Sequence, residues 1–196
     1  MELVEPIMDR DKLDAMADYL YNKNKRDYVM FEIGINLGIR VTDFTKQRVY
    51  FYRQACEKGY IDFTPSKTKR YGKKVHLPIS EDMNALIRSY IKDKDDNEWM
   101  FPSRKTLNGE QISITRQQVT RILDEAAREV GIKENIVAHS MRKTFGYWHY
   151  KYNNDIRMLM EIFNHSSEAV TLRYIGVSNE EKKKSMECMN LGVREI

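Results

Sequence analysis

The sequence predicts an α+β fold that is mostly α-helical and carries a small antiparallel β-sheet. Apolar residues recur at helical spacing over most of the 196 residues, whereas residues 60–78 alternate and are rich in β-formers. Hydrophobic residues make up 41% of the chain, which is enough for a packed core. Because no strong linker is visible, we expect one domain over residues 1–178 and a polar tail over residues 179–196.

The first part of the chain is predicted to be helical. Asp9 is a candidate N-cap for a first helix, and a second helix is expected over residues 25–37, with Gly38 placed to stop it. Thr42 is a candidate cap for a short third helix. Residues 48–52 are interpreted as a further strand.

Residues 60–65 and 73–78 predict the two arms of a β-hairpin. The segment between them is strongly basic and contains Gly72 as a turn residue. We therefore expect a hairpin with a positively charged tip.

Helices return after the hairpin. Ser80 begins one helix, residues 99–103 and Gly109 mark a loop, and Thr115 caps a long helix that runs to Gly131. The remaining helices are predicted over residues 139–150, 155–163, 166–174 and 179–190.

Composition narrows the function classes. The net charge of +4 and pI near 8.9 favour a polyanionic partner only mildly. Two distant cysteines without a CxxC pattern indicate a reducing compartment. The sequence shows neither a signal-peptide pattern nor an apolar run of membrane-spanning length. We therefore expect a cytoplasmic protein without a membrane partner. The dispersed His and Cys residues give no metal-ligand spacing.

A group of residues in the last third of the chain points to phosphate chemistry. His139 and Arg142 are three apart on a predicted helix and so share a face, and His165 and Tyr174 follow. Arginine binds phosphate oxygens bidentately, and a tyrosine hydroxyl can act as a covalent nucleophile. Upstream, Arg40 and Lys67 are candidates for a second phosphate clamp and a proton donor.

These residues lie in segments that resemble the tyrosine recombinases, the phage integrase family. Five segments follow the family order: Leu37-Gly-Ile-Arg40-Val-Thr-Asp43, Ser66-Lys67-Thr-Lys69 with Lys74-Val-His-Leu-Pro78, Trp99-Met-Phe-Pro-Ser103, His139-Ser-Met-Arg142, and Asn164-His165-Ser-Ser followed by Arg173-Tyr174. Asn164 stands where the family usually has Gly. The resemblance implies the fold of the tyrosine recombinase catalytic domain.

The resemblance also implies a role for each residue of a catalytic set. Arg40 and Arg142 would hold the scissile phosphate, and His165 would hydrogen-bond it. Tyr174 would attack the phosphate to form a 3′-phosphotyrosyl link, and His139 would assist its proton transfer. Lys67 would protonate the leaving 5′ oxygen, and Asp43 would support the site. No metal, ATP or other cofactor is implied.

The basic hairpin leaves one assignment open. Its length from Lys67 to Pro78 is slightly greater than the family spacing, so Lys69 is an alternative proton donor. Lys69, Arg70, Lys73 and Lys143 are further candidates for DNA contact.

The implied activity is site-specific cleavage and rejoining of double-stranded DNA. A homotetramer on DNA, with accessory DNA-bending proteins, would be its working form. The alternatives are a type IB topoisomerase and a non-catalytic DNA-binding protein of the same fold. The first arginine box begins near residue 38, so we expect either an isolated catalytic domain or a short enzyme like the fimbrial invertases. The tail either docks on a neighbouring subunit or packs on its own domain.

Overall fold

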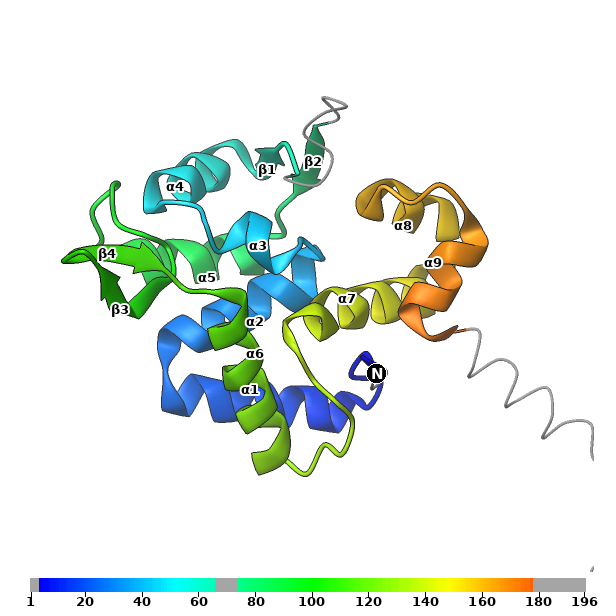
Figure 1. Ribbon diagram of the computed structural model, residues 1–196. Helices are drawn as coiled ribbons and strands as arrows, with labels where there is room; N and C mark the ends of the chain where they lie inside the picture. Colours follow the sequence, from blue (N-terminus) through cyan, green and yellow to red (C-terminus); the bar gives the residue numbers. More distant parts are fainter. Residues whose placement is uncertain (1–3, 66–73, 178–196) are drawn as a thin grey trace, which may run out of the picture.

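The computed structural model describes residues 4–65 and 74–177 (Figure 1). Within them the predicted class is confirmed, because helices dominate and the strands form two small antiparallel sheets. The elements in chain order are α1 (Arg10–Lys23), α2 (Lys25–Leu37), α3 (Val41–Phe44), α4 (Val49–Lys58), β1 (Tyr60–Phe63), β2 (Val75–Pro78), α5 (Glu81–Ile91), β3 (Pro102–Leu107), β4 (Glu110–Ser113), α6 (Arg116–Glu129), α7 (Ala138–Asn153), α8 (Ile156–Phe163) and α9 (Glu168–Ile175).

The predicted hairpin is present. Strand β1 pairs antiparallel with β2, with Tyr60 opposite Pro78 and Phe63 opposite Val75. The residues that would form its tip, 66–73, lie outside the described residues.

The loop predicted around Gly109 is wrong, because this segment forms a second hairpin. Strands β3 and β4 pair antiparallel around Asn108 and Gly109, whose φ angles are 51° and 81°. Positive φ at both central residues suits a two-residue hairpin turn, and Asn-Gly is its strongest sequence signal. The signal was therefore present in the sequence. This hairpin lies at the opposite end of the molecule from α8 and α9 (Figure 1).

The strand predicted over residues 48–52 is wrong, because this segment begins helix α4. Val49, Tyr52 and Cys56 are buried, a spacing of three and four residues that matches one helical face. Only Arg48 forms a β-bridge, to Trp99. The aromatic and β-branched composition of the segment favoured a strand, and packing of one helical face overrode it.

The helix caps follow the sequence closely. The side chains of Asp9, Ser80 and Thr115 accept hydrogen bonds from the first turns of α1, α5 and α6. Thr42 is not a cap: α3 starts one residue earlier, and its N-cap is Arg40, which makes no side-chain capping bond.

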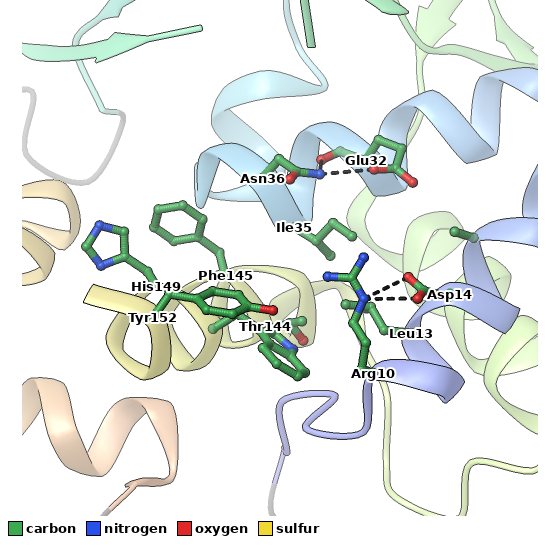
Figure 2. A pocket seen from close by; sticks show the side chains of 12 residues that line it. Arg10, Leu13, Asp14, Glu32, Ile35, Asn36, Thr144, Phe145, His149 and Tyr152 are labelled. Atoms are coloured by element: carbon green, nitrogen blue, oxygen red, sulfur yellow. Dashed lines mark hydrogen bonds and ion pairs between the residues drawn. The ribbon is translucent and has the colours of Figure 1, made fainter. Parts of the chain in front are cut away.

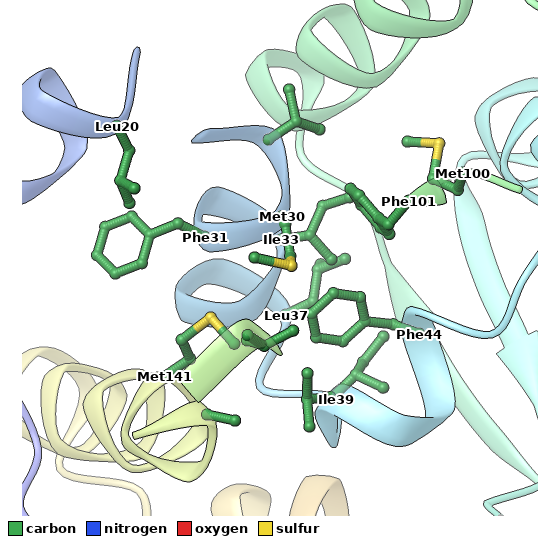
Figure 3. Packing of buried hydrophobic residues seen from close by; sticks show 14 of the residues in the cluster. Leu20, Met30, Phe31, Ile33, Leu37, Ile39, Phe44, Met100, Phe101 and Met141 are labelled. Carbon is green, nitrogen blue, oxygen red and sulfur yellow. The ribbon is translucent and has the colours of Figure 1, made fainter. Parts of the chain in front are cut away.

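Helix α2 lies at the centre of the main core. It packs on α1, α5 and α7, and its fully buried side chains face both the α1 side and the α3 side. Figure 3 shows Phe31 beside Leu20 of α1, and Phe44 and Phe101 on the opposite side of α2. The rings of Phe44 and Phe101 meet edge to face at 5.8 Å between centroids.

A second, smaller core joins α7, α8 and α9. Its buried members are Tyr147, Leu159, Phe163, Ile175 and Val177. Gly146 of α7 lets these helices approach closely, since a Cβ atom there would lie 2.6 Å from Ile175 Cγ2 and 2.8 Å from the Phe163 ring. This small core therefore fixes the position of α9 against α7.

No helix within the described residues is long and apolar enough to cross a membrane.

We predict that Gly146→Ala destabilises the protein by roughly 1–2 kcal/mol, because overpacking outweighs the gain in helix propensity. Ile175 and Phe163 are fully buried and cannot move aside. Gly34→Ala is the matched control, since it also lies within a helix and its nearest obstacle is the flexible Met141 side chain. Urea unfolding should show a clearly larger loss for Gly146→Ala; equal losses would contradict the prediction.

Candidate functional site

Arg142 is buried and joins three segments of the chain. Its Nη1 donates to the carbonyl of Gly38, and its Nη2 donates to the carbonyl of Phe163 at 3.1 Å. The guanidinium also lies over the Phe163 ring, 4.2 Å from the centroid. The first turn of α7 is thereby tied to the end of α2 and the end of α8.

Gly38 allows the first of these ties. It ends α2 with φ of 59°, and a Cβ atom at this position would lie 2.3 Å from the Phe145 ring. Only glycine accepts both the left-handed backbone and the close approach. The sharp stop places Arg40 two residues later, at the start of α3.

Arg40 lies at ion-pair distance from Asp43. Arg40 Nη1 lies 4.0 Å from Asp43 Oδ2, and the Asp43 side chain is 4% exposed. Arg40 is the N-cap of α3, and Asp43 lies three residues later within it. The helical spacing therefore brings the two side chains to the same face. Arg40 and the buried Asp43 carboxylate both lie close enough to Arg142 to act on its pKa, Arg40 lowering it and Asp43 raising it.

Tyr174 and His139 meet across 35 residues of sequence. The hydroxyl oxygen of Tyr174 lies 2.8 Å from His139 Nε2, and the two rings are perpendicular. Tyr174 also contacts the rings of Phe163 and His165, at 5.3 Å and 5.1 Å between centroids. Helix α9 thus presents Tyr174 to the same place that α7 presents His139 and Arg142.

Burial and nearby cations set the protonation states of this pair. Burial, reinforced by Arg142 and other nearby cations, lowers the pKa of His139 to about 4, so its imidazole is neutral at pH 7 and can accept a proton. Burial raises the pKa of Tyr174, and Arg142 and Arg40 oppose this rise. Burial lowers the pKa of Arg142 to about 10, which leaves it charged at pH 7.

His165 follows directly after the end of α8. Asn164 closes that helix in the left-handed conformation with φ of 52°, which Asn tolerates better than most residues. The Asn at a position where the family usually has Gly is thereby explained. His165 Nδ1 lies 3.1 Å from Thr171 Oγ1, and burial, then Arg142 and Arg40, lower the pKa of His165.

The basic hairpin candidates cannot be placed. Lys67, Lys69, Arg70 and Lys73 all lie outside the described residues. The described ends of the hairpin, Pro65 and Lys74, line a hollow of about 350 Å³ together with Glu161 and Asn164. The hairpin therefore approaches the end of α8 that carries His165.

Lys143 contacts the chain's own N-terminal segment. The Lys143 side chain is half-buried, and its Nζ donates a hydrogen bond to the Val4 carbonyl at 2.7 Å. The same Nζ lies 5.5 Å from the centroid of the Tyr174 ring. Ile7 N donates to Thr144 Oγ1, and Trp148 Nε1 donates to the Ile7 carbonyl, both at 2.9 Å. The three hydrogen bonds to Val4 and Ile7 each span more than 130 residues, so no local sequence pattern could have indicated them.

A separate pocket of about 290 Å³ lies between α1, α2 and α7 (Figure 2). It is lined by aromatic residues of α7 and by the Arg10–Asp14 ion pair, and it contains none of Arg40, His139, Arg142, His165 and Tyr174. His149 lines it, and His76 pairs with Asp62 on the exposed face of the hairpin. No group of three metal-ligating side chains occurs among residues 4–65 and 74–177.

The described site therefore brings together two guanidinium groups, two imidazoles and a phenol. Fixed cations stabilise the charge that develops on a phosphoryl group, and a hydroxyl beside a neutral imidazole can attack it. This arrangement suits phosphoryl transfer through a covalent tyrosine intermediate.

Comparison of the sequence with known proteins agrees with this chemistry. Residues 6–181 match the pattern of the phage integrase family. The chain is 41% identical over 180 residues to the probable integrase/recombinase YoeC of Bacillus subtilis (strain 168), covering 92% of this chain and 93% of YoeC. It is 28% identical to the tyrosine recombinase XerA of Pyrococcus furiosus, covering 92% of this chain and 60% of that relative.

Two solved structures share the fold. A crystal structure of XerA recombinase aligns with a TM-score of 0.72 at 18% identity, over 97% of this chain and 66% of the other. A lambda integrase dimer bound to a COC′ core site aligns with a TM-score of 0.67 at 16% identity, over 89% of this chain and 49% of the other. The chain thus spans nearly all of YoeC but about half to two thirds of these longer proteins.

We predict that His139 makes the folded protein less stable in acid. The unfolded chain binds a proton near pH 6.5, whereas folded His139 resists protonation until about pH 4, so stability falls as the pH drops between these values. The free energy of unfolding of the wild type should decrease more between pH 7 and pH 4.5 than that of His139→Asn, which keeps an acceptor for Tyr174. Because the other histidines are common to both proteins, their contributions cancel, and parallel pH curves would rule out this role of His139.

Proposed function

Because the chain belongs to the phage integrase family, the family of tyrosine recombinases, we propose how it acts. It cleaves and rejoins DNA strands at specific sites through a 3′-phosphotyrosyl intermediate. The observation that carries the proposal is the 2.8 Å contact between Tyr174 Oη and His139 Nε2 beside Arg142. The stored phosphodiester energy makes ATP unnecessary, and none of the proposed steps uses a metal.

Arg40 and Arg142 bind the scissile phosphate. A guanidinium has five N–H donors, and Arg142 uses two of them on the carbonyls of Gly38 and Phe163. The remaining donors can reach phosphate oxygens or Tyr174. The carbonyls hold the plane of Arg142 in place before DNA arrives, so little reorganisation is required on binding.

Tyr174 is the nucleophile. Its oxygen forms a bond to phosphorus while its proton passes to His139, and the bond from phosphorus to the 5′ oxygen breaks. Lys67 gives a proton to that oxygen, with Lys69 as the alternative donor. A 5′ hydroxyl of another strand then gives its proton to Lys67 and forms a bond to phosphorus. The bond from phosphorus to Tyr174 breaks, His139 returns the proton to Tyr174, and the strand is rejoined to a new partner. His165 donates a hydrogen bond to the phosphate during both steps.

Double-stranded DNA is the proposed substrate, and the working form is a homotetramer that holds two duplexes. The fold neighbour described above is a lambda integrase dimer on DNA, which supports a DNA-bound oligomer. Lys69, Arg70, Lys73 and Lys143 contact the DNA in this proposal. Residues 179–196 form a tail that docks on a neighbouring subunit, and DNA-bending proteins assist the reaction in the cytoplasm. Light scattering of the protein–DNA complex would measure the number of subunits.

Two alternatives make different products. A type IB topoisomerase would relax supercoiled plasmid without producing recombinants. A non-catalytic DNA-binding protein would form no covalent adduct. The contact between Tyr174 and His139 disfavours the second, because a binding protein has no need of a nucleophile beside a base.

We predict that Tyr174→Phe abolishes covalent adduct formation. A nicked suicide substrate traps the phosphotyrosyl product of the wild type, which denaturing gels reveal as a shifted band. Tyr152→Phe, on the exposed end of α7, is the matched control and should keep the adduct. Adduct formed by Tyr174→Phe would mean that another residue is the nucleophile.

We predict that Lys67→Ala slows cleavage of ordinary DNA by about 100-fold or more, the usual contribution of a general acid. Sulfur in place of the 5′ bridging oxygen makes a leaving group that needs no proton, because a thiol has a far lower pKa than an alcohol. The sulfur substrate should therefore restore the cleavage rate of Lys67→Ala. If it restores Lys69→Ala instead, Lys69 is the acid.

A further inference from the structure

Thr171 lies between His165 and its own helix backbone. In this structure its Oγ1 donates a hydrogen bond to the Ser167 carbonyl at 3.1 Å and also lies 3.1 Å from His165 Nδ1, and its side chain is fully buried. The same carbonyl accepts a hydrogen bond from the backbone N–H of Thr171 at 3.2 Å. The hydroxyl has one proton and two neighbouring acceptors.

The direction of this proton decides what His165 offers to the substrate. If the hydroxyl donates to Ser167, then Nδ1 must be the protonated nitrogen, and a neutral His165 presents a bare lone pair at Nε2. If the hydroxyl donates to Nδ1, the proton of a neutral imidazole resides on Nε2. Ser167 then still keeps its backbone hydrogen bond, so this second arrangement leaves no group unsatisfied.

The surroundings disfavour a doubly protonated imidazole. The charged groups that face His165 are Arg142 of α7 and Arg40 at the start of α3, and Tyr174 of α9 and Phe163 of α8 cover its ring. A lone pair at Nε2 would repel a phosphate oxygen, whereas an N–H would donate to it. Only the second arrangement gives a donor without adding a third cation.

We propose that Thr171 is a positioning residue: when a phosphate occupies the site, its hydroxyl donates to His165 Nδ1 and keeps neutral His165 with its proton on Nε2, directed at the phosphate. This inference rests on the proposed function, since it assigns a phosphate to the site. It adds to the catalytic set a residue that does not touch the substrate.

The kinetic test compares Thr171→Val with Thr171→Ser on a suicide substrate. Valine is close to threonine in shape but leaves Nδ1 without a donor in a buried place, so cleavage should slow about tenfold or more. Serine restores the hydroxyl and should recover most of the rate. Thermal unfolding of both variants separates a folding defect from a loss of this hydrogen bond.

The spectroscopic test reads the tautomer directly. In the complex of Tyr174→Phe with uncleaved DNA, ¹⁵N NMR should show Nδ1 of His165 unprotonated and Nε2 protonated. A protonated Nδ1, or wild-type cleavage by Thr171→Val, would overturn the inference alone. Failure of the wild type to form any adduct would overturn the proposed function and this inference with it.

Discussion

The site depends on one buried charge. A guanidinium removed from water is costly unless its N–H groups find partners, and Arg142 finds two main-chain carbonyls and an aromatic face. Those carbonyls belong to Gly38 and Phe163, which end two different helices. The last carbonyls of a helix have no intrahelical hydrogen-bond partner. Arg142 therefore supplies donors to these carbonyls, and the carbonyls supply acceptors to the buried guanidinium. The same contact that stabilises the charge also assembles the site.

The site lies on the boundary between two packed units. The main core is built around α2, and the smaller core joins α7, α8 and α9. Helix α7 belongs to both, so its first turn can carry His139 and Arg142 while its later turns hold α9 through Gly146. Tyr174, the proposed nucleophile, is therefore held by the small core. Arg142 contacts both units, through the Gly38 carbonyl at the end of α2 and through the carbonyl and ring of Phe163 in the small core.

Local chemistry explains which features were predictable from the sequence. Caps such as Asp9 and Thr115 and the stop at Gly38 depend on neighbouring residues only, and they were correctly predicted. The resemblance to the integrase family, through the order of its motifs, predicted which residues of the described site would lie together. Helix spacing accounts only for His139 and Arg142, which share a face of α7. The helix at Val49 was not predictable from local composition, because its burial depends on distant partners. The second hairpin carries a local Asn-Gly signal, so it was predictable from the sequence. The contacts of Thr171 and Lys143 depend on side-chain directions that no spacing encodes.

The N-terminal segment bears on how the protein can be handled. Val4 and Ile7 are bonded to Lys143, Thr144 and Trp148 on the helix that carries His139. The segment from Val4 to Ile7 is thus joined by three hydrogen bonds to the helix that also carries His139, the partner of Tyr174. A purification tag or fluorescent label fused close to this segment would lie next to the proposed site, so the choice of attachment point is itself an experimental variable.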